Sequence, residues 1–324
     1  MQRILPLFFA FCIAFVIVRT TTFGWWPVSS IRIPVSPEAV SLSGRLKKHV
    51  HILSHEIGNR DMFIDYAGLL AAADYIAGEF KNFGYDVRSQ EYDIDDKKAR
   101  NIVAIRKGSE KPDEIIVVGA HYDTCGNPGA DDNASAVSVL LELARVFSSV
   151  DTAKTIEFVA FTNEEPPFFK TPAMGSLVYA SQARKENKDI KGALVLESVG
   201  FYSHKIFSQR YPPLLGLFFP NKGNFIAVVG NLKSAKLARE VARGFRRRSL
   251  FPLRSLTIDF FPAASFSDHW SFWQAGYQAV MVTDTAFYRN PHYHNQTDTY
   301  EKLNYEYMAH IISGLENAIR ELTD

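Results

Sequence analysis

The sequence predicts an α/β protein with a three-layer αβα architecture, in which helices cover both faces of a mixed, mostly parallel sheet. From about residue 41 onward, apolar runs of strand length alternate with longer segments of helical periodicity. The run at 114–120 (EIIVVGA) is rich in β-branched residues, which is typical of a strand buried on both faces. Hydrophobic residues make up 47% of the chain and charged residues 22%, as in ordinary globular domains.

Each element follows from its local pattern. The helix predicted over 66–83 is rich in alanine, and Gly84 follows it as a stop signal. Residues 207–221 contain three prolines and fit neither period, so we expect a long loop of the kind that forms lids or binding surfaces. The remaining predicted helices cover 134–148, 175–187, 234–248 and 304–322, and the predicted strands cover 100–106, 114–120, 155–162, 192–198, 224–230 and 279–284.

The first 26 residues are expected to direct export rather than to join the fold. Residues 4–18 form an uninterrupted run of 15 apolar residues between Arg3 and Arg19, as in a secretory signal peptide. No small-residue cleavage site follows, and Trp25 and Trp26 would suit a membrane interface. An uncleaved membrane anchor and a cleaved signal peptide both remain open, and both place the rest of the chain in the periplasm or outside the cell.

Composition narrows the domain organisation and the class of partner. Residues 27–40 contain three prolines and are expected to form a linker, whereas 41–324 show no break in composition and are expected to form one domain. The 36 basic and 35 acidic residues give a net charge of +1, which argues against nucleic acid as the main partner. Only two cysteines are present, so a disulfide scaffold is excluded. The oligomeric state stays open.

Polar side chains that suit metal ions follow several of the predicted strands. They lie in His121–Asp123, Gly129–Asn133, Asn163–Glu165, at Glu197 and in Tyr293–Asp298. Sites in open α/β sheets gather at the carboxyl ends of strands, so we expect these side chains to converge. Two histidines with several carboxylates suit zinc, and a carboxylate shared by two ions suits a two-metal site.

The ordered set of strings GAHYDT, GADDNASA, FTNEE, LESVG, SDHWSFW and YHNQTDTYEKL resembles metallopeptidase family twenty-eight. That family contains co-catalytic two-zinc aminopeptidases, with relatives such as glutamate carboxypeptidase and glutaminyl cyclase. The resemblance covers roughly residues 50–320. Each string alone is a weak signal, whereas the ordered set is highly specific.

The resemblance implies two zinc ions per chain and a set of ligands. Within that set, Asp131 resembles the bridging carboxylate, and His121 and Glu197 resemble the other ligands of the first zinc. Glu164 resembles the general base that takes a proton from the attacking water. The full set of implied zinc ligands is His121, Asp131, Glu165, Glu197 and His294.

Other residues are expected to support that set. Asp123 resembles the carboxylate that orients His121, a partner expected for any histidine bound to zinc. Asp132 is expected to position Asp131. His292 is a rival ligand to His294, but His294 stands four residues before Asp298, as in the family pattern. Asp298 is itself expected to support the ligands rather than to bind metal. Asp268 and His269 are expected to line or brace the substrate pocket.

The function expected from the resemblance is that of an exported zinc aminopeptidase that hydrolyses N-terminal residues from peptides. Two alternatives stay open: an acyltransferase of the glutaminyl cyclase type with one zinc, and a non-catalytic, peptidase-like ectodomain that serves as a receptor or binding module. The sequence does not distinguish an aminopeptidase from a carboxypeptidase, and it does not indicate the preferred side chain.

Overall fold

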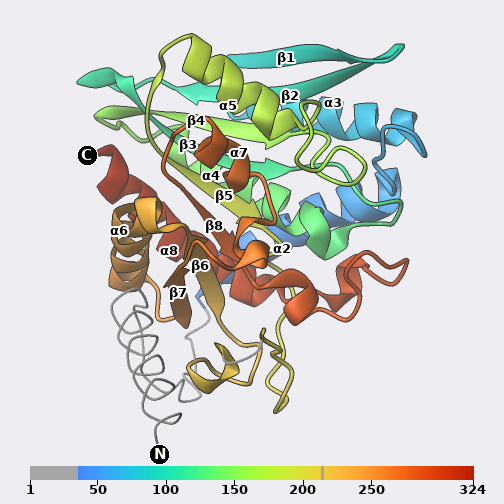
Figure 1. Ribbon diagram of the computed structural model, residues 1–324, viewed down its shortest axis with the longest axis vertical. Coiled ribbons are helices and arrows are strands. Elements are labelled where there is room, and N and C mark those ends of the chain that lie inside the picture. The colour runs from blue at the N-terminus through green and yellow to red at the C-terminus, as the bar shows by residue number, and fades with distance from the viewer. Residues whose placement is uncertain (1–35, 213–214) are drawn as a thin grey trace, which may run out of the picture.

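The computed structural model describes residues 36–212 and 215–324 (Figure 1). Within them, one sheet has the strand order β1-β2-β4-β3-β5-β8-β6-β7. The strands are β1 Val87–Ile94, β2 Lys97–Arg106, β3 Lys111–His121, β4 Lys154–Phe161, β5 Asp189–Glu197, β6 Ile226–Gly230, β7 Leu253–Thr257 and β8 Ala279–Thr283. The pairs β4–β3, β3–β5, β5–β8 and β6–β7 are parallel, and the pairs β1–β2, β2–β4 and β8–β6 are antiparallel. The predicted mixed, mostly parallel sheet is confirmed.

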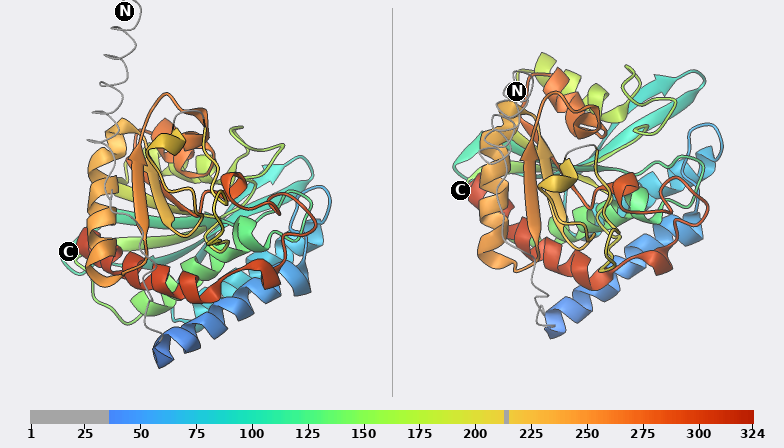
Figure 2. Two further views of the ribbon diagram at one scale, coloured as in Figure 1. Left: turned by 90° about the horizontal axis from the view of Figure 1, so that it is seen from below. Right: turned by 60° about the horizontal axis from the view of Figure 1, so that its bottom comes forward.

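Helices cover both faces of this sheet (Figures 1 and 2). One face packs against five helices: α2 Pro37–His51, α3 Tyr66–Asn82, α4 Ala136–Phe147, α6 Ala235–Arg248 and α8 Tyr305–Thr323. The other face packs against α5 Gly175–Lys185 and α7 His269–Gln274. Because side chains alternate along a strand, Ile116 and Val118 of β3 enter the first core, whereas Ile115 and Val117 enter the second. The predicted three-layer αβα architecture follows.

The six predicted strands and five predicted helices are all present, with ends displaced by a few residues. The edge strands β1 and β7 and the helices α2 and α7 were not predicted. Strand β1 has the sequence VRSQEYDI and only one fully buried residue, so it lacks the apolar pattern that identifies a strand.

The predicted boundary between linker and domain at residue 41 falls inside α2. Ser36 caps this helix by accepting a hydrogen bond from the backbone N–H of Ala39, and Pro37 occupies its first position. The end of the predicted linker is therefore helical, because a proline at the first turn of a helix starts it rather than breaks it.

The apolar segment 4–18 and most of the predicted linker lie outside the described residues. Among residues 36–212 and 215–324, no helix combines the length and the apolar character needed to cross a membrane.

The parallel strands bring the polar segments of the sequence together. His121, the last residue of β3, is paired in register with Phe161, the last residue of β4. The segment that contains Glu164 and Glu165 therefore begins beside His121. Glu197 ends β5, the other neighbour of β3. Three adjacent strands thus deliver a histidine and three glutamates to one edge of the sheet.

Candidate metal centre

The carboxylate of Asp132 lies between two histidines. Its Oδ1 is 3.2 Å from Nε2 of His121, and its Oδ2 is 3.0 Å from Nε2 of His294. The two histidines come from β3 and from the segment before α8, which are far apart in the sequence. Asp132 is 2% exposed, so one buried carboxylate joins two donor groups.

The first donor group consists of His121, Asp132 and Glu197. Nε2 of His121 is 3.2 Å from Oε2 of Glu197, and the hydroxyls of Ser267 and Ser198 donate to the two oxygens of that carboxylate. Burial favours the neutral imidazole of His121, but the carboxylates of Glu197 and Glu164 outweigh it and hold its pKa well above the ordinary value.

The second donor group consists of His294, Asp132 and Glu165. Nε2 of His294 is 3.2 Å from Oε1 of Glu165. Burial raises the pKa of Glu165 to about 8, with the neighbouring Asp132 adding to the effect. For His294, burial is outweighed by Asp132 and Glu165, which raise its pKa to about 11. These carboxylates therefore need positive charge close by.

Buried atoms without hydrogen-bond partners face the same point. Within the described residues, they include Oδ1 of Asp132, Oε1 of Glu165 and Nε2 of His294. Donor atoms of His121, Asp132 and Glu165 also lie within 4.8 Å of one another. Imidazole nitrogen and carboxylate oxygen are the ligands that zinc takes in catalytic sites. The residues present therefore fit a zinc centre on both sides of Asp132.

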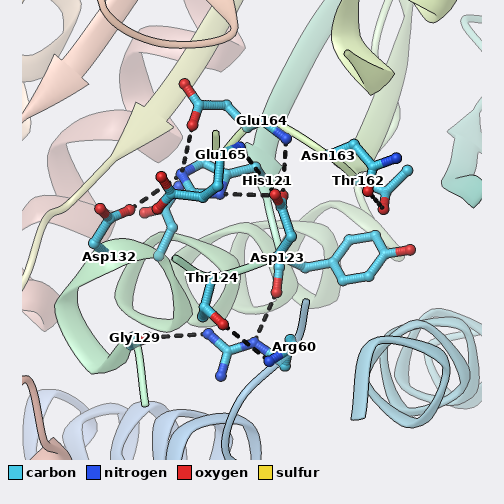
Figure 3. A network of polar contacts seen from close by, with 12 residues as sticks. Arg60, His121, Asp123, Thr124, Gly129, Asp132, Thr162, Asn163, Glu164 and Glu165 are labelled. Atoms are coloured by element: carbon cyan, nitrogen blue, oxygen red, sulfur yellow. Dashed lines mark hydrogen bonds and ion pairs between the residues drawn. The ribbon is translucent and has the colours of Figure 1, made fainter. Parts of the chain in front are cut away.

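Glu164 lies beside this centre without completing either donor group (Figure 3). Its Oε2 is 3.9 Å from Nε2 of His121. The residue is 7% exposed, and burial, together with Glu165 and Glu197, raises the pKa of its carboxyl well above the ordinary value. A buried carboxylate with a raised pKa suits proton transfer near neutral pH.

Asp123 holds three parts of the centre in place. Its Oδ1 is 3.4 Å from Nδ1 of His121, so Nε2 of that ring faces the centre. The backbone N–H groups of Glu164 and Glu165 donate to its two oxygens at 3.1 and 2.9 Å. The predicted contact between Asp123 and His121 is present, and Asp123 also sets the position of the Glu164–Glu165 turn.

Left-handed backbone turns the chain at each donor segment. Asn163, directly before Glu164, has φ 56°, and Ser198, directly after Glu197, has φ 45°. His294 itself has φ 56°. Non-glycine residues rarely adopt this conformation, and such residues concentrate at functional sites.

The predicted roles of Asp131 and Asp132 are reversed in the structure. The carboxylate of Asp131 forms no ion pair with either histidine and accepts hydrogen bonds from the backbone N–H of Gly200 and the side chain of Asn290, at 2.9 and 2.8 Å. The prediction of Asp131 as the bridging carboxylate is therefore wrong, because its oxygens are engaged elsewhere. Asp131 anchors the turn, and Asp132 faces the histidines.

Asp298 supports that turn, in keeping with its predicted auxiliary place. Its carboxylate accepts hydrogen bonds from the backbone N–H groups of Asp131 and Asp132, at 3.1 to 3.2 Å. Burial raises its pKa to about 8. The rival ligand His292 lies elsewhere, with its Nδ1 2.8 Å from the hydroxyl of Thr297.

Arg60 is a buried cation beneath the centre, and no pattern in the sequence predicted it (Figure 3). Burial lowers its pKa to about 10, against the opposing effect of Asp123 and Asp298. Its guanidinium donates to five backbone carbonyl oxygens at 2.7 to 3.0 Å, those of Leu53, Gly58, Tyr122, Pro128 and Gly129. Arg60 therefore connects the segment after β3 to the short helical segment Ile52–Ile57, which directly follows α2.

Asp268 and His269 are fully buried, and neither lines the cavity described next. Burial raises the pKa of Asp268 to about 7 and lowers the pKa of His269 to about 4. Nε2 of His269 lies 2.7 Å from the carbonyl oxygen of Ala264, a residue that does line the cavity. His269 therefore supports the cavity wall from behind. Of the two predicted roles, lining the pocket or bracing it, the contact with Ala264 fits bracing.

A cavity of about 110 Å³ opens beside the centre, and its lining includes Glu197 of the first donor group and Tyr293, the neighbour of His294. Its walls are mainly apolar and aromatic. The predicted loop 207–221 contributes Tyr211, Pro212, Leu215 and Phe219, and the remaining apolar lining includes Phe225, Leu256, Phe261, Phe266, Met281 and Phe287. Tyr293 stacks on His294 with 3.9 Å between ring centroids. Tyr293 directly precedes a predicted ligand, but no pattern in the sequence marks it as part of a cavity wall.

Comparison with known proteins identifies the family of the chain. The sequence profile of Peptidase family M28 matches residues 101–319. This chain belongs to Peptidase family M28. It is also 36% identical to the uncharacterized protein YfbL of Escherichia coli K12 over 320 residues, which cover 95% of this chain and 97% of YfbL.

Solved structures of other proteins share the fold. The zinc aminopeptidase BSAP of Bacillus subtilis superposes with a TM-score of 0.69 at 19% identity, over 87% of this chain and 95% of BSAP. Glutaminyl cyclase of Fimbriiglobus ruber superposes with a TM-score of 0.64 at 20% identity, over 91% of this chain and 99% of that enzyme. The two superpositions establish the α/β fold of the chain.

Replacement of Arg60 by lysine is predicted to destabilise the protein by at least about 3 kcal/mol. Lysine keeps the charge but lacks the guanidinium fork, so it leaves several buried carbonyl oxygens without donors, at about 1–3 kcal/mol each. The matched control is Arg247→Lys, where the arginine is 61% exposed and pairs with Glu321. Denaturant unfolding should show a change within about 0.5 kcal/mol for this control. Similar stabilities for both variants would contradict the role of Arg60.

His269 is predicted to destabilise the folded state as the pH falls from about 6.5 to about 4. The unfolded chain takes up a proton on this imidazole near pH 6.5, whereas the folded protein does so only near pH 4. The neutral imidazole's contribution to the free energy of unfolding is therefore fully present above pH 6.5. It is lost as the pH falls from 6.5 towards 4, and the loss is at most about 3 kcal/mol. His269→Gln, measured beside the wild type by denaturant unfolding with a chelator present, should lack this part of the pH dependence. Equal pH dependence in the two proteins would refute it.

Proposed function

We propose that this chain is a two-zinc aminopeptidase that hydrolyses N-terminal residues from peptides. The observation that carries the proposal is the carboxylate of Asp132, with one oxygen toward His121 and the other toward His294. In this proposal His121, Asp132 and Glu197 hold one zinc, and Asp132, Glu165 and His294 hold the other. Family membership supports the class of enzyme.

Zinc bound there would supply a water of lowered pKa and would polarise the scissile carbonyl. Glu164 accepts the proton of the attacking water, since its carboxylate lies at the centre and is not needed as a ligand. It then delivers that proton to the leaving amine. Glu165 occupies the second donor group, which explains why two adjacent glutamates have different tasks.

Tyr293 is placed to donate a hydrogen bond to the substrate. Its ring lines the cavity and stacks on His294. Burial, with the nearby carboxylates Asp132 and Glu165, raises the pKa of its phenol well above the ordinary value, so the hydroxyl keeps its proton. A protonated phenol at this place stabilises negative charge that develops on the carbonyl oxygen.

The electrostatics favour a free amino terminus over a carboxyl terminus as the anchored end of the peptide. Carboxylates crowd the centre, and the cation beneath it, Arg60, is fully buried and directed at backbone carbonyls. The two zinc ions would offset the charge of the ligand carboxylates, but Glu164 holds no metal in this proposal, and its carboxylate would attract an ammonium group and repel a carboxylate. The cavity that meets the centre at Glu197 then receives the first side chain of the peptide.

Export belongs to the proposal as well. Residues 4–18 carry the apolar run and flanking arginines of a signal peptide or membrane anchor. Either form places the zinc domain in the periplasm or outside the cell. Fractionation of cells that express the full chain tests this part, and recovery of the protein only from the cytosol would overturn it.

Glu164→Gln is predicted to lower kcat by about 10²–10⁴-fold while the zinc content stays unchanged, because Glu164 moves a proton and holds no metal. The adjacent Glu165→Gln is the matched control, and it is expected to lose zinc as well as activity. Hydrolysis of an aminoacyl p-nitroanilide and elemental analysis of the purified variants measure both quantities. Full activity in Glu164→Gln, or loss of its zinc, would show that the assignment is wrong.

Peptides that begin with leucine or phenylalanine are predicted to be cleaved with kcat/KM at least about 10-fold above those that begin with glycine. The reason is that each methylene group buried in the apolar cavity adds binding free energy. N-acetylated peptides should resist cleavage. Mass spectrometry of the products from a panel of free and N-blocked peptides measures both preferences.

Cleavage of blocked peptides alone would exclude the aminopeptidase. Cyclisation of an N-terminal glutamine with release of ammonia would favour the glutaminyl cyclase alternative, and binding without turnover would favour the non-catalytic one.

A further inference from the structure

Cys125 lies beside the second donor group and has no task in the proposed reaction. Its Sγ, a carboxylate oxygen of Glu165 and a ring nitrogen of His294 all lie within 4.8 Å of one another. The side chain is half-buried and forms no disulfide. The three atoms are a thiol, a carboxylate and an imidazole, which are the three kinds of protein ligand that zinc accepts.

The loop that carries Cys125 is fastened to the loop that carries His294. The side chain of Gln296 donates to the carbonyl oxygen of Gly126 at 2.7 Å, and that of Asn127 donates to the carbonyl oxygen of Asn295 at 3.4 Å. On the other side of Cys125, the backbone N–H of Thr124 donates to the carbonyl oxygen of Arg60. The thiol is therefore held next to the imidazole by contacts on both sides.

A second observation points to a ligand at this place. Oε1 of Glu165 and Nε2 of His294 lie 3.2 Å apart but form no well-aligned hydrogen bond among the described residues, and Glu165 is only 3% exposed. Buried polar atoms without a partner are costly unless something satisfies them. Both atoms belong to the same trio as the thiol.

We propose that the Cys125 thiolate is a further ligand of the zinc held by Asp132, Glu165 and His294. This inference rests on the proposed two-zinc function. Zinc binds sulfur at about 2.3 Å and nitrogen or oxygen at about 2.0–2.2 Å, so its ligands lie about 3.5 Å apart. The donor atoms of Cys125, Glu165 and His294 lie within 4.8 Å of one another, so they move closer together when the metal binds. On binding, the thiol releases its proton to solvent, and a sulfur electron pair forms the bond to zinc without any change of oxidation state.

The consequence is an asymmetric pair of metal positions. The first is formed by nitrogen and oxygen donors alone, whereas the second includes sulfur. Thiolate favours zinc, cobalt and cadmium over manganese and magnesium. The second position should therefore retain zinc in the presence of competing hard cations, and loss of the thiol should weaken its zinc affinity by about 10–100-fold, the cost typical of losing one supporting group at a zinc site.

The test uses the full chain with Cys12→Ser, so that Cys125 is the single thiol. The protein is loaded with cobalt, and the near-ultraviolet sulfur-to-cobalt charge-transfer band is recorded beside the cobalt content. The band should appear in this background and vanish in the additional variant Cys125→Ser. Glu197→Gln, which alters only the first donor group, should keep the band. Bound zinc should also slow the alkylation of Cys125 by iodoacetamide.

The possible outcomes separate the two proposals. Binding of two cobalt ions without the band, or alkylation at equal rates with and without zinc, would overturn the role of Cys125 and leave the proposed function standing. Failure of the protein to bind cobalt or zinc at all would overturn the two-zinc function together with this inference. A band that depends on Cys125 would establish the sulfur ligand whatever the peptide substrate is.

Discussion

The structure depends on one shared carboxylate. Asp132 places one oxygen near His121 and the other near His294, so the end of β3 and the segment before α8 meet at a single buried group. Two neighbouring carboxylates fix the groups that meet there. Asp298 accepts a hydrogen bond from the backbone N–H of Asp132, and Asp123 orients the ring of His121. Without an organising cation, such a concentration of buried acids is unfavourable, which is why a metal centre is the consistent interpretation.

The sheet brings these groups together at little local cost. The neighbours β4, β3 and β5 are parallel, so the residues that follow them emerge at one edge. Left-handed residues at Asn163 and Ser198 then turn the chain where the side chains must point inward. Arg60 secures the segment after β3 from below through backbone carbonyls. The strand ends thus supply His121 and Glu197, and segments outside the strands supply Asp132, Glu165 and His294. Residues of β6, β7 and β8 line the cavity together with loop residues.

Much of this arrangement was predictable from the sequence, and the exceptions have physical reasons. Buried strands and their polar ends were readable because apolar runs stop at His121, Asn163 and Glu197. The choice between Asp131 and Asp132 was not, because it depends on hydrogen bonds from Gly200 and Asn290, which are distant in the sequence. Arg60 lies in a polar stretch without periodicity, and nothing local marks it as buried. The edge strands β1 and β7 escaped prediction because an edge position does not require an apolar pattern.

The zinc content of the variants Asp132→Asn and Asp131→Asn tests the central claim most directly. Elemental analysis of the purified proteins, with near-ultraviolet circular dichroism to verify folding, gives the number of ions per chain. We expect two zinc ions in the wild type and in Asp131→Asn, and fewer than one in a folded Asp132→Asn, since both positions share that carboxylate. Two zinc ions in Asp132→Asn would contradict the account.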